Sequence, residues 1–473
     1  MLFNSLTFVV FLAIVIGLYY MVRPWPMRKG ILLVASYAFY AAWNPPFVLL
    51  LWGSTLVDWY VAKGIAATRN QSKKRVLVVI SLITNLGLLA FFKYGGFLLS
   101  NMTALLGTAG IEYEAAAPSI ILPVGISFYT FQTLSYTLDV YRGKIQPSSS
   151  WLNFALYVTF FPQLVAGPIV RAGQFLPQAR EEKRATSTQL LWGLYLITLG
   201  LFQKMVMADT MLAPAADTVF GRPGPVAVMD AWVGVLAFGG QIFADFAGYS
   251  VVAIGTALCL GFQLPDNFRS PYGALGFSDF WRRWHITLST WLRDYLYIPL
   301  GGNRKGVLRT LPNLLITMFL GGLWHGAAWT FVAWGLVHGL FLVIERLLVR
   351  GLGSLAVWQK SPVRIGLMLL TFVLVSLTWV FFRSPDFEKA ILIFLSLFSI
   401  ISDGPAFLPT VEILKVALVI IPLVVGHIWL RDKTLGEVVQ SWPLPVFVAI
   451  WTFMLITIIL SQGAGDAFIY FRF

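Results

Sequence analysis

The chain has 473 residues, of which 58% are hydrophobic and only 12% are charged. Because soluble domains carry about a quarter charged residues, this composition excludes an ordinary soluble enzyme and is typical of a polytopic membrane protein. The net charge of +13 comes from basic loops, which favours topology signalling and contact with anionic lipids over nucleic-acid binding. The single cysteine, Cys259, excludes an internal disulfide and offers no zinc site on its own.

Apolar stretches long enough to cross a bilayer recur along the whole chain, since a spanning helix needs about 20 mostly apolar residues. They predict an all-α membrane protein with about eleven to thirteen transmembrane helices in a single domain over residues 1–473. The first stretch lacks the basic start and small-residue cleavage site of a signal peptide, so we expect a retained span. In chain order, the predicted apolar segments are 2–21, 30–44, 46–62, 76–98, 119–140, 151–167, 188–206, 229–262, 311–330, 331–347, 363–382, 387–402, 411–430 and 443–462.

One segment with an interrupted backbone pattern covers residues 151–170. It contains Pro162, Gly167 and Pro168. Broken backbone at membrane depth must be buried in protein or line a cavity, so we predict a re-entrant piece here. The basic loops on either side of it, read with the positive-inside rule, place the N-terminus outside and these loops in the cytoplasm.

A second unusual segment, WRRWHITLSTWLRDYLYI, covers residues 281–298. Helical periodicity separates an aromatic side from a basic side, which predicts an amphipathic helix lying in the cytoplasmic membrane interface. The predicted aromatic side consists of Trp281, Trp284, Leu288, Trp291, Leu292 and Tyr295.

Two of the four histidines lie in the apolar run FLGGLWHGAAWTFVAWGLVHGL. A buried imidazole needs hydrogen-bond partners, and one lone histidine in a span is as often a packing residue as a functional one. The surroundings of His325 favour function, because Gly322 and Gly326 allow close backbone approach and leave room for a substrate. His338 lies about 220° around an ideal helix from His325. We therefore expect His338 to support packing rather than to share a metal site with His325.

A third histidine, His285, lies among cations in WRRWHITLSTWLRDYLYIPLGGNRKG. Such cations suit the phosphates of an acyl donor, but lipid headgroups would be bound by the same residues, and GGNRKG is not a Walker motif. The predicted substrate- or donor-binding residues are Trp324, Arg282, Arg283, Arg293, Asp294, Arg304 and Lys305.

Five stretches together are similar to the membrane-bound O-acyltransferase family, and within it to the bacterial branch of alginate O-acetylation membrane proteins. The resemblance runs from LFNSLTFVVFL near the N-terminus to about residue 347, and the two histidine motifs are its most specific part. The stretches are FWRRWHITLSTWLRDYLYIPLGGNRKG, NLLITMFLGGLWHGAAWTFVAWGLVHGL, LPVGISFYTFQTLSYTLDVYRG, FFPQLVAGPIVR and FADFAGYS.

This resemblance implies a ring of tilted helices around a central catalytic channel, with His325 and His285 as the catalytic residues. It implies that an acetyl group from cytoplasmic acetyl-CoA, a substrate rather than a bound cofactor, crosses the bacterial inner membrane. An extracytoplasmic acetyltransferase partner of the SGNH type would then O-acetylate a secreted polysaccharide such as alginate or cellulose.

A buried histidine also suits acyl transfer on physical grounds. Attack by a hydroxyl on a thioester needs a base, and histidine is the side chain whose pKa lies nearest neutrality. Burial in an apolar core keeps the imidazole neutral and able to accept a proton. We therefore predict that His325 is the general base, while a role as nucleophile stays open.

Other functions stay open at this point. Within the class, the reaction could be D-alanyl transfer to teichoic acid or O-acylation of peptidoglycan. A transporter or proton channel would use the histidines with Asp58, Asp139 and Asp245 as a relay, although each of these acids could simply pair with Arg or Lys. A scaffold that docks an external enzyme would make both predicted catalytic histidines dispensable.

Overall fold

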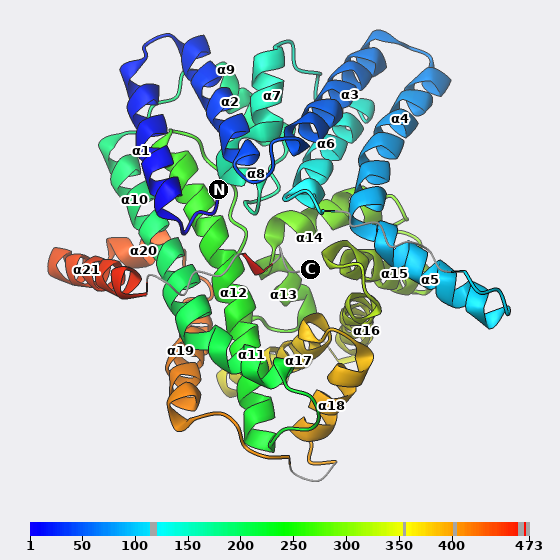
Figure 1. The fold of residues 1–473 in the computed structure, drawn as a ribbon, viewed down its shortest axis with the longest axis vertical. Coiled ribbons are helices and arrows are strands. Elements are labelled where there is room, and N and C mark those ends of the chain that lie inside the picture. Colours follow the sequence, from blue (N-terminus) through cyan, green and yellow to red (C-terminus); the bar gives the residue numbers. More distant parts are fainter. Residues whose placement is uncertain (114–120, 353–355, 401–403, 462–467, 470–473) are drawn as a thin grey trace. The chain divides into compact units, whose positions relative to one another are not determined.

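The computed structural model describes residues 1–113, 121–352, 356–400, 404–461 and 468–469, and these form helices and loops without a β-strand (Figure 1). The chain divides into two compact units. The first comprises residues 1–197 and 252–265, and the second comprises residues 198–251 and 266–473. The predicted all-α class is confirmed.

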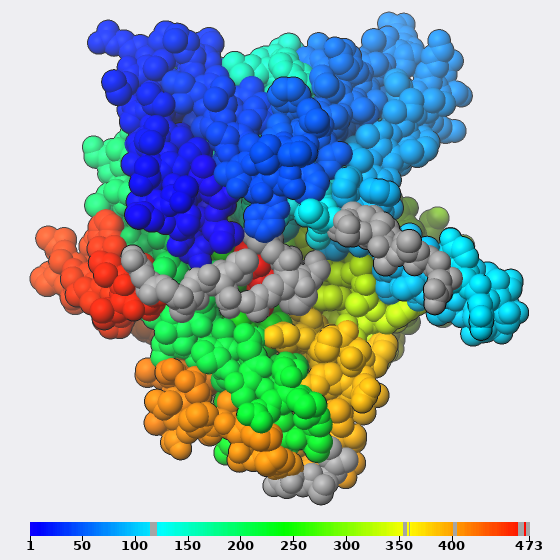
Figure 2. Space-filling model, viewed as in Figure 1, coloured from blue at the N-terminus to red at the C-terminus, as the bar shows by residue number. Residues whose placement is uncertain are grey.

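The first unit is a set of helices in which α3 packs against both α4 and α6. The last of its N-terminal helices, α5, has no buried residue and projects at the cyan edge of this unit (Figure 2). The elements are α1 (Leu6–Met21), α2 (Trp25–Ala41), α3 (Phe47–Ala67), α4 (Gln71–Leu89), η1 (Ala90–Tyr94), α5 (Gly95–Thr108), α6 (Ile126–Tyr141), α7 (Trp151–Thr159), α8 (Phe161–Leu164), α9 (Ala172–Arg180) and most of α10 (Ser187–Leu201).

A buried polar network joins α3, α4 and α6. The Asp58 carboxylate accepts hydrogen bonds from Asn85 Nδ2 and Thr137 Oγ1, both at 2.7 Å, and from the Ser81 hydroxyl. The donors described for this carboxylate are therefore neutral groups and not Arg or Lys. Asp139 does have a cation nearby, with Lys144 Nζ 3.8 Å from its Oδ1.

The predicted interruption in residues 151–170 is present. Helix α7 begins at the N-cap Ser150, whose hydroxyl accepts from Asn153 N at 3.3 Å, and it ends at Thr159. Helix α8 then covers only Phe161–Leu164, and the residues around it are buried in protein. Burial of broken backbone fits the expectation for such a piece; its path relative to the membrane stays a prediction.

The second unit has an aromatic core. The rings of Trp334 and Trp379 stack with their centroids 5.7 Å apart, and the Trp284 centroid lies 5.1 Å from that of Trp379. Its elements are η2 (Phe202–Leu212), α11 (Ala213–Gly221), most of α12 (Val228–Cys259), η3 (Pro271–Gly273), α13 (Phe277–Arg283), α14 (Ile286–Leu292), η4 (Arg293–Tyr297), α15 (Val307–His325), α16 (Trp329–Leu352), η5 (Ala356–Gln359), α17 (Ser361–Arg383), α18 (Phe387–Leu397), α19 (Thr410–Trp429), α20 (Leu435–Gln440) and α21 (Leu444–Leu460).

A buried lysine in the π-helical segment η2 pairs with two carboxylates. Lys204 Nζ lies 2.7 Å from Asp209 Oδ1 and 2.5 Å from Asp245 Oδ1 on α12. The expected cation partner of Asp245 is thus confirmed. A buried charge is tolerated when it is paired in this way.

Seven helical stretches among the described residues are long and apolar enough to cross a membrane, judged by length and composition. Two further apolar helices, α1 and α21, are shorter. The count is below the predicted eleven to thirteen because several predicted segments form short or interrupted helices. The chain is a multi-pass membrane protein. The seven stretches are Gln71–Thr108, Ser187–Gly221, Val228–Cys259, Val307–His325, Trp329–Leu352, Ser361–Arg383 and Thr410–Trp429.

Candidate active site

His325 is the last residue of α15, which packs very closely against α16. A Cβ added at Gly322 would collide with the Phe331 carbonyl oxygen, and one added at Gly335 would collide with the Met318 carbonyl oxygen. Only glycine permits this approach, so the predicted close helix contact at Gly322 is confirmed.

The space beside Gly326 is filled by protein. A Cβ at this position would overlap the aromatic ring of Phe331, and a Cβ at Gly321 would lie 3.2 Å from Leu292 Cδ1. The expectation that Gly326 leaves room for a substrate is therefore wrong. This glycine serves helix packing, because α16 folds back on α15 directly after the histidine.

Aromatic rings surround His325, whose exposed fraction is 2%. The ring centroid of His325 lies 4.9 Å from that of Trp324, 5.0 Å from that of Trp334 and 5.3 Å from that of Phe382. Each pair has an edge-to-face arrangement, which aromatic rings favour. These rings fix where the imidazole lies and lower the polarity around it.

His285 occupies a break between two helices. Helix α13 ends at Arg283 and α14 begins at Ile286, with His285 in the left-handed region at φ 43° and ψ 54°. The prediction of one continuous amphipathic helix over residues 281–298 is therefore wrong. A non-glycine residue held in this conformation marks a constraint that the surrounding structure imposes, and such residues cluster at active sites.

The aromatic side predicted for this segment packs into the second unit instead of facing outward. Trp284, Leu288, Trp291, Leu292 and Tyr295 are all buried. The Trp284 ring, for example, stacks on Phe280 at 5.5 Å. Sequence periodicity identified the apolar face, but a protein core covers it.

The His285 side chain is buried, with an exposed fraction of 0%. Its Nδ1 lies 3.1 Å from Asn267 Oδ1, and its ring contacts Phe246 edge-to-face at 4.6 Å. Burial lowers the pKa of His285 to about 3. This imidazole is thus neutral at physiological pH.

The two predicted catalytic histidines lie close together. Their ring centroids are 6.5 Å apart, and Trp324 contacts both rings, at 5.9 Å from His285 and 4.9 Å from His325. A direct hydrogen bond needs nitrogen atoms within about 3.2 Å, and this centroid separation is too large for that. The spacing instead suits a reacting group that touches both imidazoles, as paired catalytic groups require.

His338 lies on α16 among rings of the same core. Its centroid is 4.8 Å from that of Trp334 and 5.2 Å from that of Trp281. Its Nε2 lies 2.9 Å from Thr378 Oγ1. Trp334 thus lies between His338 and His325, and the contacts of His338 are those of a packing residue.

The predicted donor-binding cations differ in their surroundings. Arg282, Arg304 and Lys305 are exposed. Arg293 Nε lies 2.8 Å from Asp294 Oδ1, at the first turn of η4. Arg282 precedes His285 in the sequence, and the other three cations follow it within 20 residues.

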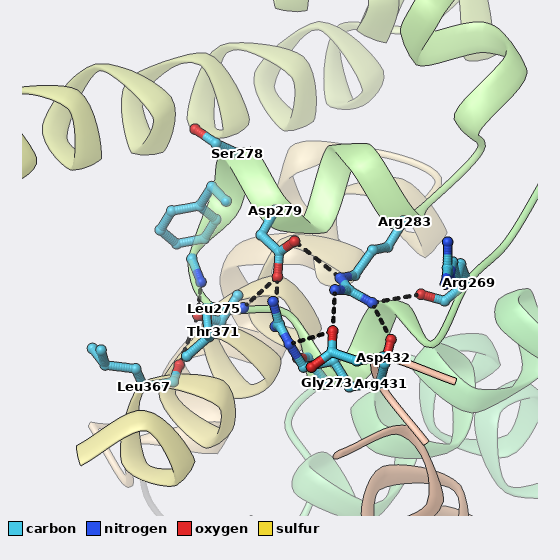
Figure 3. A network of polar contacts seen from close by, with 12 residues as sticks. Arg269, Gly273, Leu275, Ser278, Asp279, Arg283, Leu367, Thr371, Arg431 and Asp432 are labelled. Atoms are coloured by element: carbon cyan, nitrogen blue, oxygen red, sulfur yellow. Dashed lines mark hydrogen bonds and ion pairs between the residues drawn. The ribbon is translucent and has the colours of Figure 1, made fainter. Parts of the chain in front are cut away.

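Arg283 belongs to a polar network that anchors α13 (Figure 3). The Asp279 carboxylate lies between two guanidinium groups, with Arg283 Nε at 2.9 Å and Arg431 Nη1 at 2.7 Å, and it accepts from Leu275 N at 2.8 Å (Figure 3). Burial alone would raise the pKa of Asp279, but the Leu275 hydrogen bond and the two arginines outweigh it and lower the pKa. Arg283 Nη1 also donates to the Arg431 carbonyl oxygen at 2.7 Å. This network holds the helix that ends just before His285.

Sequence patterns did not identify some of the residues that lie beside the histidines in the structure. Asn267 lies in the loop LPDNF, where a lone asparagine has no motif. Phe468, close to the C-terminus, packs 5.6 Å from Phe246 and 4.4 Å from Tyr249, while Ile469 N donates to Asp245 Oδ2 at 2.9 Å. The positions of Asn267 and Phe468 beside the histidine segment result from contacts between residues far apart in the sequence, which local patterns do not predict.

Comparison with known proteins identifies the family of this chain. Residues 144–374 match the model of the MBOAT, membrane-bound O-acyltransferase family. The chain is 40% identical over 402 residues to the probable alginate O-acetylase AlgI of Azotobacter vinelandii, covering 84% of this chain and 78% of that protein. It is 38% identical to the peptidoglycan O-acetyltransferase of Helicobacter pylori, covering 76% and 72%. It is 30% identical to the teichoic acid D-alanyltransferase of Streptococcus thermophilus, covering 48% and 57%. The predicted resemblance is therefore confirmed, and the chain is an O-acyltransferase that belongs to the membrane-bound O-acyltransferase family.

Proposed function

We propose that this enzyme moves acetyl groups from cytoplasmic acetyl-CoA across the bacterial inner membrane for O-acetylation of a secreted polysaccharide such as alginate or cellulose. Support comes from the relatives: the alginate O-acetylase and the peptidoglycan O-acetyltransferase align over at least 72% of either chain. The D-alanyltransferase aligns over only 48% of this chain. Acetyl transfer is therefore favoured over D-alanyl transfer.

The single observation that carries the proposal is the pair of buried histidines with ring centroids 6.5 Å apart. In the proposed step, His325 accepts the proton of an acceptor hydroxyl as that oxygen bonds to the thioester carbonyl carbon. The carbon–sulfur bond then breaks, and the thiolate leaving group takes the proton from the imidazolium. The neighbouring His285, neutral and buried, contributes the second imidazole of the site.

The donor and the partner are parts of the same proposal. The exposed cations Arg282, Arg304 and Lys305, with Arg293 beside Asp294, suit the phosphates of acetyl-CoA. Trp324 contacts both imidazoles. An extracytoplasmic acetyltransferase of the SGNH type would take over the acetyl group and modify the polymer.

The experiment is complementation of a knockout strain with wild type, His325→Ala, His285→Ala or His427→Gln, at equal membrane expression. Acetate is measured in the secreted polysaccharide and in purified peptidoglycan. We expect His325→Ala and His285→Ala to lose polysaccharide acetate. His427 is a half-buried histidine on α19, and we expect His427→Gln to keep the acetate.

Each other outcome identifies a different function. Retained acetate with His325→Ala would return this residue to core packing and make a scaffold role the leading explanation. Loss confined to peptidoglycan would identify peptidoglycan as the acceptor.

A further inference from the structure

Asn267 is a buried residue of the loop after α12. Its hydrogen bonds connect this loop to α12 and to the segment that begins at His285. Its exposed fraction is 1%. Its Oδ1 lies 2.9 Å from Thr287 Oγ1, 3.3 Å from Thr287 N and 3.1 Å from His285 Nδ1, and its Nδ2 donates to Ser250 Oγ on α12 at 3.1 Å. Its carbonyl oxygen also accepts from Ile286 N at 2.9 Å.

These contacts determine which nitrogen of His285 carries the proton. The backbone N–H of Thr287 can only donate, so the Asn267 atom that faces it is the oxygen. An amide oxygen can only accept, so His285 Nδ1 must donate to it. In a neutral imidazole the proton on Nδ1 leaves the lone pair on Nε2.

The same residue also restrains the backbone at His285. The left-handed conformation there is followed at once by the Ile286 N–H, which donates to the Asn267 carbonyl oxygen. Side chain and backbone of Asn267 therefore hold His285 and the first two residues of α14. An imidazole bound in this way has one tautomer and one orientation.

We propose that Asn267 is a positioning residue of the acyl-transfer reaction, which fixes His285 in the tautomer whose Nε2 carries the lone pair and can accept a hydrogen bond from a reacting group. The inference rests on the proposed function, because it assigns a role to a residue that supports one of the two proposed catalytic histidines.

The test uses the full chain in inside-out membrane vesicles supplied with radiolabelled acetyl-CoA and measures transfer against pH. Asn267→Leu removes the acceptor, and we expect the kcat to fall by about 10- to 100-fold, by analogy with the loss seen when the hydrogen-bond partner of a metal-bound histidine is removed. We expect the KM for acetyl-CoA to stay unchanged, because Asn267 is buried and its hydrogen bonds join it to Ser250, His285 and Thr287. Asn267→Asp keeps an acceptor at Nδ1, so we expect it to restore most of the rate.

The aspartate variant adds a readout that a purely structural role would not move. A carboxylate beside His285 favours the protonated imidazole, so the low-pH limit of the rate should move to higher pH. Thr378→Val, which removes the partner of the buried non-catalytic His338, is the matched control and should leave the rate and its pH profile unchanged.

The outcomes separate this inference from the proposed function. If His285→Ala keeps full activity, the proposed role of His285 fails. If His285→Ala is inactive while Asn267→Leu keeps the wild-type kcat, the positioning role fails and the proposed function stands. Should Asn267→Leu fail to reach the membrane, Asn267→Asp decides alone, and a low rate with an unshifted low-pH limit would overturn the inference.

Discussion

His325 and His285 lie close together, and the contacts described for the two imidazoles differ. The neighbours described for His325 are the rings of Trp324, Trp334 and Phe382, at the end of a helix packed through glycines. His285 is held by an amide hydrogen bond at a backbone break. Rings restrict where an imidazole lies, whereas an amide oxygen also selects which nitrogen carries the proton. For His285, therefore, the described contacts define both where the ring lies and which nitrogen carries the proton.

The largest expected effect tests whether the two histidines act as one unit. We expect His325→Gln and His285→Gln each to lower acyl transfer by about 10²- to 10⁴-fold, the usual contribution of a general base. The double variant should be no slower than the slower single variant, because groups that share one step are not additive. Initial rates in membrane vesicles measure this. Losses that multiply would show two independent sites.

An effect of intermediate size, on stability, tests the close packing of α15 against α16 beside His325. In Gly322→Ala the new Cβ meets the Phe331 carbonyl oxygen, a backbone atom that cannot rotate away. We expect destabilisation by at least about 1–3 kcal/mol, measured by thermal unfolding in detergent. Gly366→Ala on α17 is the matched control, since nothing lies within 4 Å of its added Cβ. The control should gain up to about 1 kcal/mol from helix propensity, and equal effects of the two variants would contradict the close packing.

A smaller, pH-dependent effect tests the anchor of α13. The pKa of Asp279 is lower in the folded protein than in the unfolded chain, so this carboxylate stabilises the fold above about pH 4 and loses that contribution as the pH falls through the folded pKa. Asp279→Asn should therefore lower the melting temperature at pH 6 and reduce its further fall toward pH 3. Asp294→Asn, on the nearby η4 turn, is the control. An unchanged slope in Asp279→Asn would contradict the role of the network.

The smallest expected effect concerns His338, which lies near His325 and His285 but has no proposed role in the reaction. Thr378→Val removes the hydroxyl that lies 2.9 Å from His338 Nε2. We expect a loss of about 1 kcal/mol in stability, the usual value of one hydrogen bond, without loss of acyl transfer. Thermal unfolding together with the vesicle assay checks both parts. A marked loss of activity would place His338 in the reaction and widen the comparison from two histidines to three.

Sequence patterns identified the helical class, the family, the close approach at Gly322 and the two histidines, because each depends on local motifs or on periodicity. They did not predict the break at His285, since Trp281 to Tyr295 keep a helical period across it. Nor did they identify Asn267, whose partners Ser250 and Thr287 come from other segments and meet only in the folded chain. The aromatic face of residues 281–298 was recognised as apolar, but its burial in the core depends on the surrounding α12, α16 and α17.

The left-handed backbone at His285 has a consequence for engineering this enzyme. A non-glycine residue in that conformation costs about 1–3 kcal/mol, which glycine would recover. Glycine would also leave empty the place of a buried imidazole that packs on Phe246 and is hydrogen-bonded to Asn267. Because truncating a large buried side chain costs about 2–5 kcal/mol, the packing of this ring offsets the backbone strain, and position 285 is a poor target for a stabilising substitution.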